Sequence, residues 1–227
     1  MNALQTYLEK CPTKHVPKGT IIVLQDEIPE CAFGVKQGTV RVYNVTANGE
    51  EKSLSFSVGI DVFPVCWVFA QTDRSLFYYQ AYTDCELYII DRQDFIEYLK
   101  ATPELAYVLL AKQVEAYVSE SMRVNALSQA KASAKLLATL RHLCLRHGHD
   151  VRKDRVKIQI PLTQQEIANM VGLTRETTVV ELNKLKEAGV LTTNRKYYTI
   201  NTSKLNELID DDYNPGIVLG SPRHNAW

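Results

Sequence analysis

Short hydrophobic runs and polar turns follow one another in the first part of this chain. Between His15 and Asp91, runs rich in β-branched and aromatic residues are separated by glycine-containing turns. The runs are 20–25, 31–38, 39–45, 52–58, 76–83 and 85–91. Such runs are typical of β-strands, and Asn48-Gly49 is the strongest hairpin signal among them. Many short strands at regular spacing predict an antiparallel barrel or roll.

A helical period replaces the strands after Asp91. We expect a short helix over 91–98, a long helix over 103–127 and a further helix over 128–147. The long helix carries five residues at spacings of four and three, a heptad seam suited to a partner helix. They are Leu110, Val114, Tyr117, Ser121 and Val124. A single buried amphipathic helix is the alternative, but Leu105, Leu109 and Ala116 form a second apolar side, which favours a dimerisation helix.

The most specific pattern lies in residues 161–189. Thr163 and Glu166 form a capping-box pattern that starts a helix. Gly172 ends that helix, and Thr174 is placed to cap a second one. Two helices joined by so short a glycine-containing turn predict a helix-turn-helix, whose second helix can enter the major groove of DNA. A helical hairpin with a solvated polar face is the alternative.

The second helix of this pair has an apolar and a polar face. Thr178, Leu182 and Leu185 share its inner face, whereas Glu176, Val180 and Asn183 face outward. Gly189 is suited to end the helix in a left-handed conformation. In the first turn, Arg175 can donate two hydrogen bonds to guanine and Glu176 can accept one from cytosine, while Val180 can pack on a thymine methyl group.

A basic hairpin is expected directly after the second helix. Two short β runs surround Asn194, with Arg195 and Lys196 near the tip, where the wing of a winged helix would touch phosphates. Residues 201–208 are expected to form a closing helix. The sequence therefore predicts an α+β fold. Its expected parts are a β-roll effector domain over 1–102, a dimerisation helix over 103–127, a winged helix-turn-helix over 128–209 and a flexible tail over 210–227. A hinge is expected at 127–130.

The charge distribution supports this division. The net charge is zero. Residues 1–127 hold 11 Lys and Arg against 16 Asp and Glu, whereas residues 128–205 hold 14 against 6. The positive excess coincides with the helix-turn-helix, as a phosphate-binding surface requires. Five scattered cysteines without a CxxC pair indicate reduced thiols. With no signal peptide and no membrane-spanning run, we expect a cytoplasmic protein without a membrane partner.

In its order of elements the chain resembles the CRP/FNR superfamily of bacterial transcription regulators. The resemblance spans roughly residues 14–205 and is most specific over 17–59 and 162–191. It implies that Arg175 and Glu176 read bases and that Gln165, Thr174 and Thr177 contact phosphates; we include Thr163 in this DNA-contacting set. The family usually has a second arginine where this chain has Val180. The missing contact is worth about 1–3 kcal/mol of discrimination, so the family's usual operator is not assumed.

The resemblance also locates an effector pocket in the roll, but the residues there differ. Cyclic-nucleotide binders of the family carry a Gly-Glu-Leu turn and an Arg-Ser or Arg-Thr pair. Here the turn is Gly59-Ile-Asp61 without the glutamate, and Arg74-Ser75 aligns about one residue out of place. The positions that contact the base fall near Ser119 and Glu120. Because Asp61 would repel a cyclic phosphate, a cyclic nucleotide is disfavoured and the effector is unknown.

Metal and enzyme chemistry find little support in the sequence. Cys11 and Cys31 are too far apart to reproduce the cysteine run of the family's iron–sulfur sensors, so no cluster is expected. His142, His147 and His149 could bind a metal, but no acidic or thiolate partner has ligand spacing, and a solvated helix end is the expectation. Residues 19–90 contain no histidine, which argues against a cupin-like metalloenzyme. No catalytic set emerges.

The sequence therefore predicts a homodimeric regulator of transcription that binds a palindromic site in double-stranded DNA. RNA polymerase is expected as a further partner. Two alternatives remain open. The roll could have lost its effector and serve only dimerisation, or the protein could be a ligand-binding module that recruits another protein through its winged helix.

Overall fold

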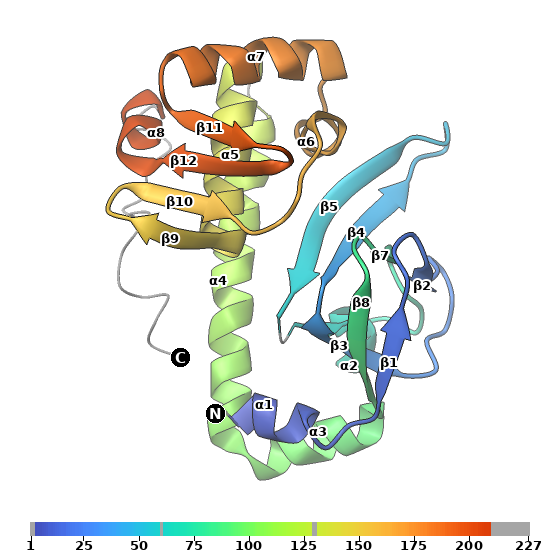
Figure 1. The fold of residues 1–227 in the computed structure, drawn as a ribbon. Coiled ribbons are helices and arrows are strands. Elements are labelled where there is room, and N and C mark those ends of the chain that lie inside the picture. Colours follow the sequence, from blue (N-terminus) through green and yellow to red (C-terminus); the bar gives the residue numbers. More distant parts are fainter. Residues whose placement is uncertain (1–2, 60, 129–130, 210–227) are drawn as a thin grey trace. The chain divides into compact units, whose positions relative to one another are not determined.

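The computed structural model describes residues 3–59, 61–128 and 131–209 and forms two compact units, Met1–Leu110 and Ala111–Trp227 (Figure 1). We call them unit 1 and unit 2. The predicted tail over 210–227 and part of the predicted hinge over 127–130 lie outside the described residues. Helix α4 (Pro103–Leu127) begins in unit 1 and ends in unit 2. Within the described residues, no helix combines the length and apolar character needed to cross a membrane.

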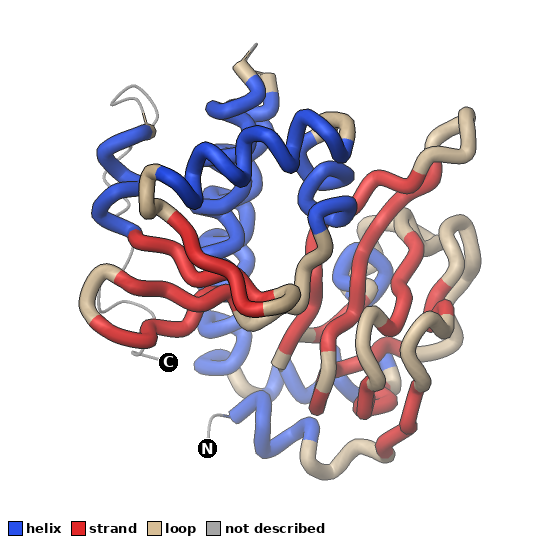
Figure 2. Tube along the Cα trace, turned by 45° about the horizontal axis from the view of Figure 1, so that its top comes forward, coloured by secondary structure: helices blue, strands red, loops and turns tan. Residues whose placement is uncertain are grey.

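Unit 1 is built on two antiparallel sheets of four strands each. The sheets have the orders β1-β8-β3-β6 and β2-β7-β4-β5, and Figure 2 shows their strands in red. The strands are β1 (Thr13–Val16), β2 (Ile21–Val23), β3 (Ala32–Gln37), β4 (Thr39–Val45), β5 (Glu51–Val58), β6 (Val62–Phe63), β7 (Tyr78–Ala81) and β8 (Cys85–Ile90). The predicted antiparallel roll is therefore confirmed. The hairpin signal at Asn48-Gly49 is also confirmed, because that pair lies in the loop between β4 and β5.

Two buried apolar clusters hold unit 1 together. One lies between the sheets and includes Val35, Val40 and Leu87. The other packs the helices of unit 1 against the roll and includes Phe95 and Leu105, with Leu109 partly buried at its edge. These helices are α1 (Ala3–Leu8), α2 (Val65–Val68), α3 (Arg92–Ala101) and the start of α4. The start of α4 is thus fixed to the roll through Leu105 and Leu109, two members of the second apolar side of this helix.

The turn between β3 and β4 depends on a glycine at position 38. Gly38 has a φ of +95°, and a Cβ atom there would meet the carbonyl oxygen of Asp84 and, at 2.8 Å, the Sγ atom of Cys85. Gly49 also has a positive φ, of +78°, but a Cβ atom there would meet nothing within 4 Å. The two positions therefore share backbone strain and differ only in crowding.

We expect Gly38→Ala to lower the free energy of unfolding by about 2–3 kcal/mol. Gly49→Ala, the matched control, carries only the left-handed strain of about 1 kcal/mol. Urea unfolding of both variants measures the difference. Equal losses in the two variants would show that the contact with Asp84 is relieved at little cost.

Unit 2 packs helices on one small antiparallel sheet of order β11-β12-β10-β9. Its elements, after α4, are α5 (Ala132–His147), β9 (Gly148–Arg152), β10 (Arg155–Ile158), α6 (Gln164–Val171), α7 (Arg175–Glu187), β11 (Leu191–Asn194), β12 (Tyr197–Asn201) and α8 (Thr202–Leu208). The helix-turn-helix, the basic hairpin and the closing helix are confirmed. The fully buried interior of unit 2 includes Leu140, Ile158, Ile167 and Leu182.

Several elements differ from the sequence-based expectations. Residues 148–152 form strand β9, for which no strand was expected, because all of them are exposed and only pairing with β10 orders them. Strands β1 and β6 and helix α2 were not predicted; each is four residues long or shorter, too short to show a period. Helix α3 extends past Tyr98 to Ala101, and α5 begins at Ala132 rather than at residue 128.

Candidate nucleic-acid interface

Two threonine caps fix the starts of the helix-turn-helix pair. Thr163 Oγ1 accepts a hydrogen bond from the backbone N–H of Glu166 at 3.1 Å, and Thr174 Oγ1 accepts one from the N–H of Thr177 at 3.2 Å. Each bond satisfies a backbone donor that the first turn of a helix leaves without a partner. Gly172, between the helices, is left-handed with a φ of 67°. Both predicted caps and the predicted helix break are confirmed.

Helix α7, the second helix of the pair and the predicted recognition helix, exposes the residues that the sequence assigned to base contact. Arg175 and Glu176 lie exposed in its first turn, and Val180 is 54% exposed one turn later. Thr178, Leu182 and Leu185 are buried on the opposite face. The start of α7 is therefore open to a partner, and the helix is held from behind by the core of unit 2.

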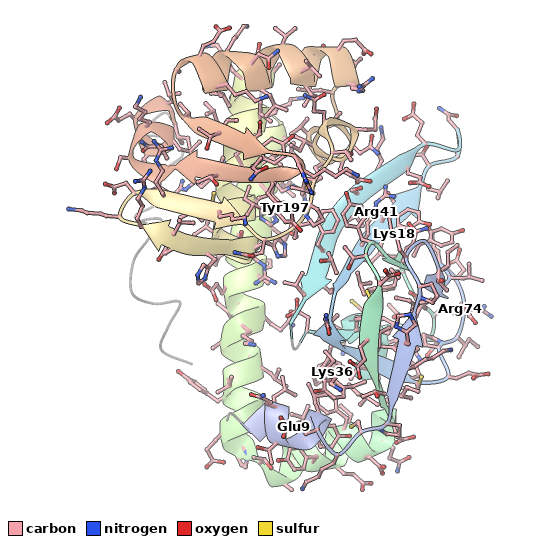
Figure 3. All side chains as sticks on the ribbon, in the orientation of Figure 1. Glu9, Lys18, Lys36, Arg41, Arg74 and Tyr197 are labelled. Carbon is pink, nitrogen blue, oxygen red and sulfur yellow. The ribbon has the colours of Figure 1, made fainter. Side chains whose placement is uncertain are left out.

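The wing is tied to the start of α6. Strands β11 and β12 pair antiparallel, with Asn194 opposite Tyr197. The carbonyl oxygen of Lys196 accepts a hydrogen bond from the N–H of Leu162 at 2.8 Å. Next to the tip of the hairpin, Lys157 Nζ stands 4.9 Å from the ring centroid of Tyr197, which is labelled in Figure 3. The tip residues are therefore held at a fixed distance from Thr163.

An open groove of about 560 Å³ joins α6, α7 and the wing. Five predicted residues line it: Thr163, Gln165, Arg175, Arg195 and Lys196. Lys186 also lines it and was not predicted. Its signal is present in the sequence, because Lys186 follows Arg175 by eleven residues, about three helical turns, and so shares its face. Four of the described lining residues are cationic and none of them is Asp or Glu, which suits an anionic polymer.

Thr174, Thr177 and Gln165 hold their side chains in local contacts. The hydroxyl groups of Thr174 and Thr177 lie 3.0 Å apart, so one donates to the other and the second hydrogen stays available to a ligand. Gln165 Nε2 donates to Asn169 Oδ1 at 2.9 Å, one turn along α6. These contacts fix the rotamers of the side chains without blocking the groove.

The residues of the predicted effector pocket fall into three places. In unit 1, the Arg74 side chain, labelled in Figure 3, donates to the carbonyl oxygen of Asp26 at 2.7 Å, and the Ser75 hydroxyl donates to the carbonyl of Phe77. Gly59 and Asp61 follow β5, where Asp61 Oδ2 accepts from the N–H of Val58. Ser119 and Glu120 lie in the part of α4 that belongs to unit 2.

Ser119 and Glu120 contact a buried histidine that was expected at a solvated helix end. His142 and His147 are 3% and 5% exposed, so that expectation is wrong for both; only His149 is exposed. His142 Nδ1 lies 2.8 Å from Ser119 Oγ, and Nε2 lies 3.4 Å from Glu120 Oε1. Burial, with the positive charge of Arg123 next, lowers the pKa of His142 to about 3. Burial likewise lowers the pKa of His147 to about 3.

The protonation state follows from these pKa values. At neutral pH the His142 ring is uncharged, so its 3.4 Å contact with Glu120 is not an ion pair. In the tautomer with hydrogen on Nε2, Nδ1 accepts a hydrogen bond from the Ser119 hydroxyl and Nε2–H is directed to the side of Glu120. Sequence reasoning missed this arrangement, since α4 and α5 meet here only through tertiary packing.

The described residues contain no metal-binding cluster and no disulfide. No group of three or more His, Cys, Asp or Glu side chains there could hold a metal ion. The five cysteines are free thiols.

Four of the five seam residues on α4 are large hydrophobic side chains that are more than half exposed: Leu110, Val114, Tyr117 and Val124.

A β roll followed by a long helix and a winged helix-turn-helix with a cationic groove defines a class of DNA-binding regulators. Two family models match the chain: a cyclic nucleotide-binding domain over residues 13–102 and a Crp-like helix-turn-helix domain over residues 134–208. The chain belongs to the CRP/FNR family of DNA-binding transcription regulators.

Relatives match along most of the chain. The HTH-type transcriptional regulator ArcR of Staphylococcus epidermidis is 27% identical over 88% of this chain and 86% of its own length. The cAMP-activated global transcriptional regulator CRP of Escherichia coli O157:H7 is 24% identical over 85% of this chain and 91% of its own. Among solved structures, FixK2 from Bradyrhizobium japonicum has a TM-score of 0.73 at 19% identity, covering 88% of this chain and 98% of that chain, a likeness of fold. ArcR and CRP are transcription regulators and not enzymes.

Proposed function

We propose that this regulator binds a palindromic operator as a homodimer and inserts α7 of each protomer into the major groove. The observation that carries the proposal is the groove in which Arg175, Lys186, Arg195 and Lys196 gather without a carboxylate among the described lining residues. A two-fold dimer presents this groove twice, about 34 Å apart along the DNA, which corresponds to one helical turn.

Base reading falls to the exposed start of α7. Arg175 donates to guanine O6 and N7, Glu176 accepts from the cytosine amino group, and Val180 packs on a thymine methyl group. The residues in and around the groove would contact phosphates. They are Thr163, Gln165, Thr174, Thr177, Arg195 and Lys196, and we add Lys186. Residues 128–209 thus serve as the DNA-binding domain.

Dimerisation falls to α4, residues 103–127. In the single chain, Leu110, Val114, Tyr117 and Val124 are exposed along one stripe, which also includes Ser121. An exposed apolar stripe at heptad spacing is the surface that a second identical helix covers. RNA polymerase is proposed as the partner that converts DNA binding into a change in transcription.

The roll, residues 1–102, is proposed to receive a small effector. Gly59, Asp61, Arg74 and Ser75 would contact it in unit 1. The Asp61 carboxylate disfavours a cyclic phosphate, and Arg74 Nη1 already donates to the carbonyl oxygen of Asp26. Together these two observations favour the alternative of an effector-independent DNA binder. Calorimetry with cyclic nucleotides, with and without operator DNA, separates the two, because an effector must alter operator affinity.

We expect Arg175→Ala and Lys196→Ala to weaken DNA binding in different ways. Selection of bound DNA from a random pool first supplies the operator. Arg175→Ala then loses discrimination at one base pair of each half-site, by about 1–3 kcal/mol. Lys196→Ala weakens binding to every sequence alike and reduces the slope of log affinity against log salt by about one per protomer.

Lys153→Ala is the matched control, since Lys153 is exposed in the β9–β10 turn and does not line the groove. Fluorescence anisotropy with operator and with random duplex, at several salt concentrations, gives both quantities. Equal losses on every duplex for both variants would contradict the assigned roles. Salt-insensitive binding of the wild-type protein to all DNA would favour a protein-interaction module instead.

A further inference from the structure

Within unit 2, α4 presents two different faces. Val114, Tyr117 and Val124 are exposed on one face. Ser119 and Arg123, which lie roughly on the opposite side at 3.6 residues per turn, are 5% and 7% exposed. The helix that carries the seam therefore also carries buried polar side chains toward the helix-turn-helix.

Arg123 connects α4 to the end of α6. Its Nη2 atom donates to the carbonyl oxygen of Met170 at 3.2 Å, and its Nη1 atom donates to Glu120 Oε2 at 2.9 Å. Met170 belongs to the last turn of α6 (Gln164–Val171), whose carbonyl groups have no partner within the helix. A guanidinium there also faces the negative end of the helix dipole.

The end of α6 is coupled to the start of the recognition helix by a short, fixed turn. Gly172 and Leu173 both donate their N–H groups to the carbonyl oxygen of Ala168. Thr174 then begins α7 with its side-chain cap. Thr174 lies only four positions after Met170, so a change in the direction of α6 relative to α4 is passed to α7.

We propose that Arg123 is a positioning residue that sets the angle between α4 and the recognition helix, and through it the half-site spacing that the dimer accepts. This inference rests on the proposed dimeric function. In a dimer joined along the exposed stripe, the two α4 helices are the fixed frame. The contact between Arg123 and Met170, on the opposite face, then determines how far apart the two α7 helices stand.

Half-site spacing gives a readout that a loss of stability does not move. The selected operator is compared with versions in which the half-sites are one base pair closer or farther apart. A partly unfolded preparation binds all three more weakly by the same factor, so the ratio of affinities is unchanged. If the angle between α4 and α7 is no longer fixed, the affinities for the three operators instead become more nearly equal. The experiment uses the full-length protein and fluorescence anisotropy.

Arg123→Met removes the hydrogen bonds and keeps an aliphatic side chain. We expect its spacing preference to fall by roughly 2- to 30-fold, the range over which residues that couple distant sites act. Arg123→Lys keeps a cation at the end of α6 and should give an intermediate preference. Val156→Ala is the control; Val156 is buried in β10 of unit 2, and its loss lowers stability without touching the contact between Arg123 and Met170.

The outcomes separate this inference from the function on which it rests. A flattened spacing preference in Arg123→Met, with Val156→Ala like the wild type, supports the inference. An unchanged preference in Arg123→Met, or an equal flattening in Val156→Ala, overturns it while the dimeric function stands. A wild-type protein without any spacing preference overturns the dimeric function and this inference with it. If Arg123→Met does not fold, Arg123→Lys decides between the same outcomes.

Discussion

Lowering the pH from 7 to 5 is expected to cost unit 2 about 4 kcal/mol of its free energy of unfolding, about 2 kcal/mol for each of two buried histidines. In the folded protein the pKa of His142 and of His147 is about 3, whereas in the unfolded chain both return to about 6.5. Between these values the unfolded chain binds protons that the folded chain does not. Stability is therefore fully present above about pH 6.5 and is lost as the pH falls toward 3.

Urea unfolding at pH 7, 6 and 5 measures this loss. His142→Gln should remove about half of the pH dependence, whatever it does to stability at pH 7. The control is His149→Gln, because His149 lies in the same segment but is exposed, and this change should leave the pH dependence as it is. Proton NMR titration of the folded protein gives an independent check. A His142 signal that titrates near pH 6.5 would refute the burial on which the expectation depends.

A carboxylate in the α4 seam is expected to have the second large effect. Val114→Glu places two like charges opposite each other in a paired helix, so the dimer should dissociate. Without simultaneous contact to both half-sites, operator affinity should fall by roughly 10²- to 10⁴-fold. The protomer itself should be little affected, because Val114 is 52% exposed in the single chain.

Val151→Glu is a closely matched control for this change. Val151 is 57% exposed on β9, away from the seam, and undergoes the same substitution. Sedimentation equilibrium reports the oligomeric state and anisotropy reports the affinity. A dimeric Val114→Glu protein with wild-type affinity would mean that the protomers do not associate through this stripe.

The parts of the fold that could be predicted are those determined by neighbouring residues. Thr163 and Thr174 cap helices because of groups three positions away, and Gly172 ends a helix because of its own backbone freedom. The same holds for most strands of the roll, because β-branched and aromatic residues within each run favour a strand locally. The order of elements then indicated the family, which the matching family models bear out.

The parts that could not be predicted depend on residues distant in sequence. His142 appeared to end a solvated helix, but Ser119 lies 23 positions earlier and meets it only when α4 packs on α5. β9 has no apolar face of its own and is ordered by β10. Lys186 joins Arg175 and Lys196 in one groove because the wing folds back toward α6.

The hydrogen bond from Leu162 to the carbonyl oxygen of Lys196 has a consequence for the thermodynamics of association. A loop that became ordered only on contact with DNA would lose about 1–2 kcal/mol of conformational entropy for each residue it fixed. Here the backbone of Lys196, at the hairpin tip, already has a hydrogen-bond partner in the free protein. The proposed phosphate contacts of the tip would therefore require less ordering of its backbone, and a complex with DNA would gain affinity from rigidity as well as from charge.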